Sequence, residues 1–149
     1  MNFNSIKINE PQSPEEFEAY YLLRYKVLRK PWNKPLGSEK DEMEETGIHA
    51  WATDETNLVF GVCRLQFNST EEAQLRFMGV AEFAQGKGIG KKLIDYLEGK
   101  AKEKGAKKMI LQSRENAVPF YLKCGYSVVE KSFLMWGEIQ HYLMEKELV

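Results

Sequence analysis

The sequence predicts one mixed α/β domain whose sheet is mostly antiparallel and contains one parallel strand pair. Three segments of alternating apolar residues, at 48–53, 58–67 and 73–80, are joined by short turns, a pattern typical of an antiparallel meander. A helical pattern over 88–104 then leads to a short apolar strand at 109–111, and such a strand–helix–strand crossover makes its two strands parallel. The length of 149 residues, 43% of them hydrophobic, fits a single domain, which we expect to span residues 1–149.

The first elements are a short strand at 6–8 and a helix from Ser13 to about Leu28. Ser13 can cap this helix, Pro14 suits the first helical position, and Glu16 completes a capping box. Irregular chain follows over 31–47. Seven acidic residues and one lysine lie between 39 and 55, which indicates either a solvated loop or an acidic rim that attracts a cationic substrate.

The later elements follow from the same kinds of pattern. In the strand at 58–67, alternation places Cys63, Leu65 and Phe67 on one face and polar side chains on the other. Apolar residues recur at four-residue spacing along the helix at 88–104. A brief helix is expected after Asn116, which is predicted to cap it, and it stops at Gly125. Strands at 126–133 and 139–148 complete the chain.

Composition excludes several classes of protein. The formal net charge of -1 argues against a nucleic-acid binder. Eight lysines between 87 and 108 leave that function as an alternative, although a solvated helix face explains them better. No apolar run reaches the ~20 residues of a membrane span, and residues 1–5 lack the start of a signal peptide. Two cysteines make a poor disulfide framework, so we expect a cytoplasmic protein; no cysteine–histidine cluster has metal-ligand spacing, so we expect no metal.

The most informative segment has glycines at 86, 88 and 90, just before the helix at 88–104. Glycine permits positive φ and close approach of a ligand, and a helix N-terminus offers unpaired amides, so the segment suits a pyrophosphate. Lys87, Lys91 and Lys92 add positive charge. Lys92 stands where a P-loop needs Ser or Thr, and the glycine spacing does not fit the dinucleotide fingerprint. A glycine-rich turn without a ligand is the alternative.

Two motifs in order resemble the GNAT superfamily, the GCN5-related N-acetyltransferases. Gln85-Gly86-Lys87-Gly88-Ile89-Gly90 resembles its Gln/Arg-x-x-Gly-x-Gly/Ala signature, and Phe120-Tyr121-Leu122-Lys123-Cys124-Gly125-Tyr126 resembles its later Phe-Tyr-x-x-x-Gly-Phe/Tyr motif. The resemblance covers nearly the whole chain, and residues 24–28, His49 and 141–148 are similar to the bacterial ElaA-like group. It implies the acyl-CoA N-acyltransferase fold, with a splayed parallel pair and helices on both faces of the sheet.

The resemblance also implies acetyl-CoA as co-substrate and direct acetyl transfer to a primary amine of a small molecule or peptide. The residues that it assigns to cofactor binding are Met78, Gly79, Val80, Gln85, Gly86, Lys87, Gly88, Ile89, Gly90 and Lys91. Among them, the Val80 amide would polarise the thioester carbonyl. Arg114 stands where the family often has Asn, so Arg114 and the nearby Asn116 are both candidates for a further cofactor contact.

Tyr121 matches the family's general acid, which would protonate the departing thiolate; an ordinary half-buried tyrosine is the alternative. For the general base we favour His141 over His49, although either histidine could serve a structural role. Cys124 is expected to pack as a small apolar residue. A non-catalytic module that senses acyl-CoA or binds a partner is the alternative function. We expect a monomer or homodimer.

Overall fold

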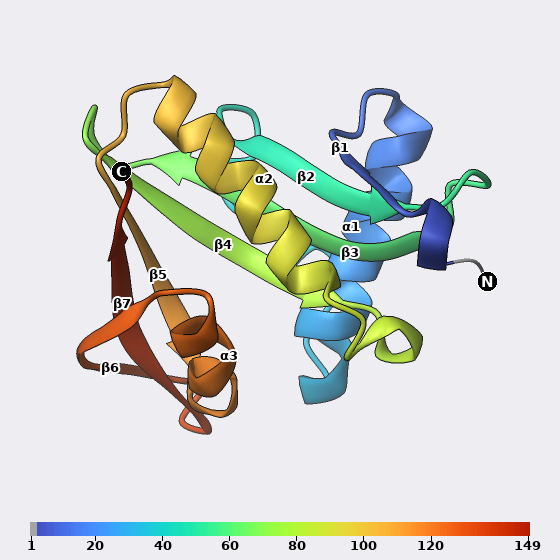
Figure 1. Cartoon of the computed structure of the whole chain (residues 1–149). Coiled ribbons are helices and arrows are strands. Elements are labelled where there is room, and N and C mark those ends of the chain that lie inside the picture. Colours follow the sequence, from blue (N-terminus) through green and yellow to red (C-terminus); the bar gives the residue numbers. More distant parts are fainter. Residues whose placement is uncertain (1–2) are drawn as a thin grey trace.

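A computed structural model describes residues 3–149 and forms one seven-stranded sheet in the order β1-β2-β3-β4-β5-β7-β6 (Figure 1). The strands are β1 (Lys7–Asn9), β2 (Ile48–Thr53), β3 (Val59–Phe67), β4 (Glu72–Val80), β5 (Lys108–Arg114), β6 (Ser127–Met135) and β7 (Ile139–Glu147). Of the pairings described, β4 with β5 is parallel and the others are antiparallel, which confirms the predicted fold class. The signal-peptide expectation falls partly on Met1 and Asn2, which lie outside the described residues.

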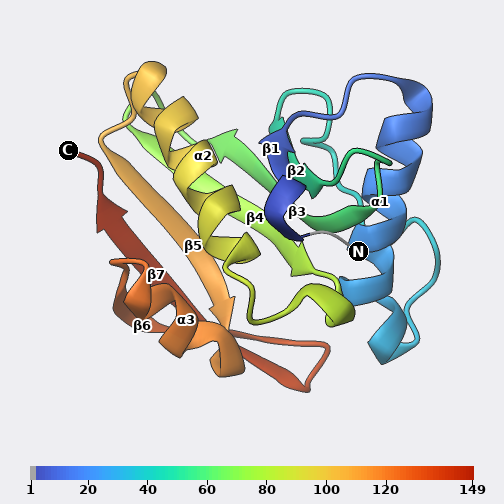
Figure 2. The same ribbon diagram turned by 45° about the vertical axis from the view of Figure 1, so that its right-hand side comes forward.

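Helices cover both faces of the sheet. The α-helices are α1 (Pro14–Leu28), α2 (Ile89–Glu103) and α3 (Val118–Lys123), and short 3-10 turns are η1 (Phe3–Ser5), η2 (Lys30–Trp32), η3 (Glu82–Ala84) and η4 (Glu115–Ala117). Figure 2 shows α1 on one face and α2, with α3 below it, on the other. Within the part of the chain that the structure describes, no helix is long and apolar enough to cross a membrane.

The predicted start of α1 is confirmed in detail. The Ser13 side chain accepts a hydrogen bond from the Glu16 amide at 3.1 Å, and the Glu16 carboxylate accepts one from the Ser13 amide at 3.4 Å. Two amides that the helix cannot satisfy internally are thereby paired. The cap fixes where α1 begins, and thus where its C-terminal end meets the sheet.

The main core lies between α2 and the sheet. Leu93, Leu97 and Ala101 are fully buried on one side of α2, as their spacing predicts. Cys63 and Leu65 of β3 face this core. The alternate residues of β3 therefore face α1 on the opposite side.

The parallel pair separates after a short contact. Four residues of β4, 72–75, pair with residues 108–111 of β5, and no further pairing between these strands is found in the described chain. On its other side, β4 has two residues, Phe77 and Met78, opposite the single residue Cys63 of β3, which is a β-bulge. Phe77 takes a positive φ of 56° there. The splay is the feature that the family resemblance implies.

Two predicted boundaries differ from the structure. Strand β5 runs to Arg114 instead of ending at residue 111, because its second half pairs with β7. Asn116 does not cap α3: it lies inside the 3-10 turn η4, and Ala117 takes the N-cap position without a side-chain bond. Pro119 in the first turn of α3 has no amide hydrogen, which lowers the need for a cap.

Candidate active site

The splay between β4 and β5 opens into a cavity of about 930 Å³. Its wall brings together most of the residues predicted for the site, namely Met78, Val80, Gln85, Gly86, Gly88, Ile89, Gly90, Arg114, Asn116, Tyr121 and His141. The C-terminal end of α1 and the β6–β7 hairpin close the opposite side through Leu28, Arg29 and Met135. The cavity thus reaches from the start of α2 to the end of α1.

The glycine-rich segment forms an open turn at one end of this cavity. Gly86 and Gly88 have φ values of 76° and 79°, in the left-handed region that favours glycine, and a Cβ at either position would meet no atom within 4 Å. Gly88 is the N-cap of α2 and supplies no side-chain partner for the first amides of the helix. These amides are available to an anion in the cavity.

Three residues of the predicted cofactor set do not line the cavity. The Lys87 ammonium lies 5.4 Å from the centroid of the Phe3 ring. Lys91 forms an exposed ion pair with Asp95 at 2.9 Å. Gly79 faces α1, since a Cβ on it would lie 3.4 Å from Val27. Lys123 of α3, which the sequence analysis did not assign to the site, does line the cavity.

Tyr121 lies in the cavity wall with its ring packed between aromatic neighbours. Its ring centroid is 5.0 Å from that of Phe120 and 6.1 Å from that of Tyr126, and the residue is 8% exposed. Its hydroxyl has no hydrogen-bond partner among residues 3–149, whereas the Tyr126 hydroxyl donates to Glu98 at 2.8 Å. Burial raises the pKa of Tyr121 far above its usual range, so the phenol stays protonated.

His141 reaches the same cavity from β7, directly opposite Arg114 of β5. Its Nδ1 lies 2.9 Å from the Ile139 carbonyl oxygen, and because a carbonyl only accepts, Nδ1 carries the proton. The ring stacks on Phe133, with a 4.3 Å centroid distance. Burial, and then the charges of Arg114 and Arg29, lower the pKa of His141, so its Nε2 is a free base near neutral pH.

His49, the other candidate base, is held on both nitrogens. Its Nδ1 lies 2.8 Å from the Tyr20 hydroxyl and its Nε2 lies 2.7 Å from the Glu44 carbonyl oxygen. It lines a smaller pocket beside α1, away from the splay. His49 therefore fixes the strand β2 against α1 and the acidic segment.

A buried ion-pair network on the α1 face was not predicted. Arg24 of α1 and Arg64 of β3 both have fully buried side chains, and both contact Glu44 at 2.8 Å. Arg64 also contacts Asp41 at 2.6 Å. Asp41 and Glu44 thus bind arginines of the fold, whereas Glu42, Glu45 and Glu55 are exposed, as a solvated loop predicts. No acidic residue of this segment lines the cavity.

The network also encloses the bulge of β4. The guanidinium carbons of Arg24 and Arg64 lie 4.3 and 5.0 Å from the centroid of the Phe77 ring, and that of Arg76 lies 4.9 Å away. Such cation–π contacts hold an aromatic ring in place. They support the positive φ of Phe77 and so help to fix the bulge beside the cavity.

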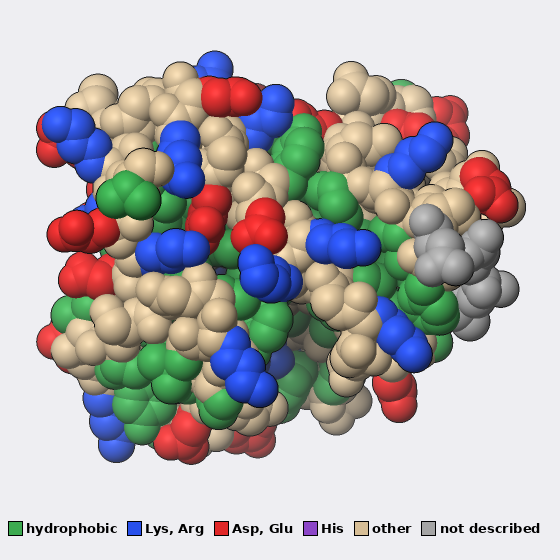
Figure 3. Space-filling view, viewed as in Figure 1, with side chains coloured by type: hydrophobic (Ala, Val, Ile, Leu, Met, Phe, Trp, Pro, Cys, Tyr) green, Lys and Arg blue, Asp and Glu red, His purple; other side chains and the backbone are tan. Residues whose placement is uncertain are grey.

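Two further expectations concern residues outside this centre. Cys124 is buried next to α3 with its pKa raised by burial, as expected of a packed thiol. On the face over α2, basic and acidic side chains are interspersed (Figure 3). Several of the lysines there are paired with carboxylates, as Lys100 is with Glu103 and Lys108 with Glu72. That face offers no unbroken basic surface.

Both a family model and a curated relative match most of this chain. Residues 12–126 match the model of the acetyltransferase (GNAT) family. The uncharacterised N-acetyltransferase YjcF of Bacillus subtilis is 32% identical over 137 residues, which cover 91% of this chain and 96% of YjcF.

Solved structures share the fold along nearly the whole chain. A protein from Lactobacillus plantarum, provisionally assigned as an N-acetyltransferase, superposes with a TM-score of 0.86 at 22% identity, covering 98% of this chain and 100% of that one. An aminoglycoside 6'-N-acetyltransferase in complex with coenzyme A gives 0.80 at 18% identity (96% and 97% covered). Escherichia coli ElaA gives 0.78 at 18% identity (95% and 98% covered). At these identities the likeness establishes the fold alone.

Proposed function

Because the chain belongs to the acetyltransferase (GNAT) family, we propose that it transfers the acetyl group of acetyl-CoA directly onto a primary amine of a small molecule or peptide. One observation carries the proposal. A single cavity joins the open amides at the start of α2 to the unpartnered hydroxyl of Tyr121 and the free Nε2 of His141. An anion-binding end and an acid–base end are thus connected through the splay.

The glycine-rich turn suits the pyrophosphate of the cofactor. The amides of residues 85–90 supply donors, and Lys123 rather than Lys91 supplies a nearby positive charge in the wall. The pantetheine arm would lie in the splay, where backbone groups of Met78 and Val80 can pair with it. The Val80 amide would then polarise the thioester carbonyl. Asn116, exposed and without a capping bond, remains a candidate cofactor contact.

The acid and the base act at different atoms. As the amine nitrogen attacks the thioester carbon, Nε2 of His141 accepts the amine proton, and negative charge develops on the carbonyl oxygen. Collapse of this tetrahedral intermediate breaks the carbon–sulfur bond and expels the thiolate. The Tyr121 hydroxyl, which burial keeps protonated until this step, gives its proton to that sulfur, and the phenolate then regains a proton from solvent once the products leave.

The first test is to titrate acetyl-CoA by calorimetry and to compare Tyr121→Phe with the parent protein. We expect the variant to keep its affinity for acetyl-CoA within about twofold and to lose roughly 100-fold or more in kcat, the usual contribution of a general acid. Release of free CoA with an amine panel, detected with a thiol reagent, gives the rate.

Tyr126→Phe is the matched control, because that hydroxyl is already bound to Glu98 outside the cavity. It should lower stability by about 1 kcal/mol and leave kcat unchanged. Equal turnover of Tyr121→Phe and the parent across pH removes Tyr121 as the acid. Binding of acetyl-CoA without thiol release for any amine favours the acyl-CoA sensor instead. We further propose a cytoplasmic protein, in keeping with its two free cysteines, that acts as a monomer or homodimer.

A further inference from the structure

The α1 side of the cavity is lined by arginines and by no acidic residue. Arg29, Arg76 and Arg114 line it, and within residues 3–149 no Asp or Glu does. We infer that the amine acceptor carries an anionic group, a carboxylate or a phosphate, which these arginines bind. The inference rests on the proposed function and names its substrate class.

Arg29 is buried without a carboxylate partner. It is 7% exposed, its Nε donates to the Ser38 carbonyl at 3.0 Å and its Nη1 to the Leu28 carbonyl at 2.9 Å. No ion pair to Arg29 is found among the described residues. Since a guanidinium carries five N–H donors, Nη2 retains two that these contacts do not use.

Arg114, at the end of β5, is also held by a backbone carbonyl and not by a carboxylate. Its Nη2 donates to the same Leu28 carbonyl at 3.2 Å, and its guanidinium carbon lies 4.3 Å from the Trp32 ring centroid. Burial, together with the charge of Arg29, lowers the pKa of Arg114 to about 10, so it stays cationic at neutral pH. Its Nε and Nη1 make no hydrogen bond within the described chain.

Arg76 completes the group from the bulged strand β4. Its side chain is 40% exposed, and its one ion-pair partner in the described chain is Asp41 at 3.5 Å. Asp41 already accepts two bonds from Arg64, at 2.6 and 3.0 Å. Arg76 is therefore only partly neutralised.

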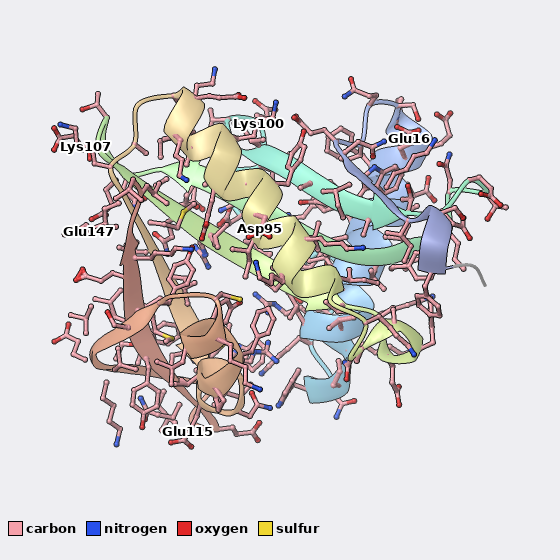
Figure 4. The ribbon with its side chains drawn as sticks, viewed as in Figure 1. Glu16, Asp95, Lys100, Lys107, Glu115 and Glu147 are labelled. Atoms are coloured by element: carbon pink, nitrogen blue, oxygen red, sulfur yellow. The ribbon has the colours of Figure 1, made fainter. Side chains whose placement is uncertain are left out.

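The local charge balance is positive. Five guanidiniums, those of Arg24, Arg29, Arg64, Arg76 and Arg114, lie in this region. The carboxylates that act on them are those of Glu39, Asp41, Glu42 and Glu44, one fewer than the guanidiniums. Glu115, which follows Arg114, instead accepts from the Tyr142 hydroxyl at 3.1 Å and lies at the lower margin of the molecule (Figure 4). Unpaired buried charge is costly, and an anionic ligand removes that cost.

The position of the arginines separates them from the cofactor phosphates. The glycine-rich turn precedes α2 on one face of the sheet, while Arg29 ends α1 on the other (Figure 2). Arg114 pairs directly with His141, the proposed base. The anionic group and the amine of the acceptor should therefore lie only a few bonds apart in one small molecule. This differs from the expectation of a cationic acceptor, because two of the acidic residues that suggested it, Asp41 and Glu44, bind Arg24 and Arg64, and no acidic residue of the described chain lines the cavity.

The test compares amines in matched pairs that differ only in the anionic group: an amino acid with its carboxamide, and an amino sugar with its phosphate ester. We expect the acid-bearing member of at least one pair to give a kcat/KM at least tenfold higher for CoA release. The amino-acid pair tests the carboxylate and the amino-sugar pair tests the phosphate. Release that is equal or faster with every neutral member overturns the inference but leaves the proposed function intact.

Arg76→Gln should lower kcat/KM for the acid-bearing amine by about 10- to 100-fold, leaving that for its neutral partner and the affinity for acetyl-CoA nearly unchanged. Arg114→Gln should lower kcat/KM for the acid-bearing amine more than for its neutral partner, which it also affects because the Arg114 charge acts on His141. Lys26→Gln, on the exposed side of α1, removes a positive charge outside the cavity. It should change neither kcat/KM for the two amines nor the affinity for acetyl-CoA. Arg76 is half-exposed, so its variant tests the idea even if Arg114→Gln does not fold.

If no amine releases CoA, the proposed function fails, and binding decides the inference. Calorimetry on the CoA-saturated protein should then still show tighter binding of the acid-bearing member, weakened by Arg76→Gln. Equal binding of both members, or no binding of either, overturns it.

Discussion

At the scale of single residues, unused hydrogen-bonding atoms separate the candidate catalytic residues from residues of the same type that are bonded within the fold. Both nitrogens of His49 are engaged, whereas His141 uses only Nδ1. The same contrast separates Tyr126, whose hydroxyl is bound, from Tyr121. A group whose hydrogen bonds are already made within the fold has little to offer a substrate.

His141→Asn tests the base. An asparagine can keep the bond to the Ile139 carbonyl while removing the free ring nitrogen. Because burial lowers the pKa of His141, protonation of Nε2 should add an acidic limb to kcat/KM below the usual histidine range, separate from the fall at higher pH that protonation of the amine itself causes. The variant should be roughly 100-fold slower at pH 8 and lack this acidic limb. If the variant shows the same loss of kcat/KM at low pH, a group other than His141 causes that loss.

The residues of the two motifs that line the cavity could be located from the sequence because short sequence patterns carry them. The arginine network could not, since its partners lie far apart in sequence: Arg64 contacts Asp41, and Arg114 contacts Leu28. A signal did exist for part of it. Arg24 shares the helical spacing of Tyr20 and Leu28, and a charged residue on a buried stripe requires a partner.

At the scale of elements, α2 is a regular helix, and the turn before it has a backbone conformation that favours glycine. Gly88, with φ of 79°, lies at the N-cap, whereas Gly99 lies inside the helix with no atom within 4 Å of an added Cβ. The two glycines therefore respond in opposite ways to the same substitution.

Gly99→Ala should stabilise the protein by about 0.5–1 kcal/mol, because alanine loses less backbone entropy in a helix. Gly88→Ala should destabilise it by about 1–2 kcal/mol, since the left-handed conformation strains any Cβ. It should also weaken acetyl-CoA binding, which Gly99→Ala should not. Denaturant unfolding and calorimetry measure both. Equal acetyl-CoA affinity of the two variants would remove the turn from the cofactor site.

Element predictions succeeded where the determinants are local and failed where they are not. The capping box of α1 lies within four residues, and its prediction is confirmed. The second half of β5 exists through pairing with β7, about 30 residues later, which no local pattern reveals. The predicted capping role of Asn116 was wrong because η4 moves the N-cap of α3 one residue later, to Ala117.

At the scale of the whole molecule, the acidic segment fastens α1 to the sheet. Glu44 contacts Arg24 of α1 and Arg64 of β3, and Asp41 contacts Arg64 and Arg76. Burial raises the pKa of Asp41, but hydrogen bonds from Arg64 and Met43 outweigh it and lower the pKa from 3.8 to about 2. The charged form of Asp41 therefore stabilises the folded state.

Asp41→Asn should lower the free energy of unfolding by about 2 kcal/mol at pH 7, because it leaves Arg64 short of a charged partner. The native carboxylate stabilises fully above pH 3.8 and loses its effect as pH falls towards 2. The difference between the variant and the parent should shrink over that range. Glu42→Gln, an exposed neighbour, is the control and should change little. If the difference in free energy of unfolding between the variant and the parent does not change with pH, the destabilisation comes from altered packing and not from the lost charge.

The splay of β4 and β5 has a topological consequence. A seven-stranded open sheet has two free edges, here those of β1 and β6, but separation after four residue pairs gives this sheet two more, facing each other in its interior. Outer edges must be protected against pairing with other chains, because a whole strand can approach them. The inner edges face each other across a cavity inside the fold, so they can bind an extended ligand while the surrounding elements keep a strand of another chain from pairing along them.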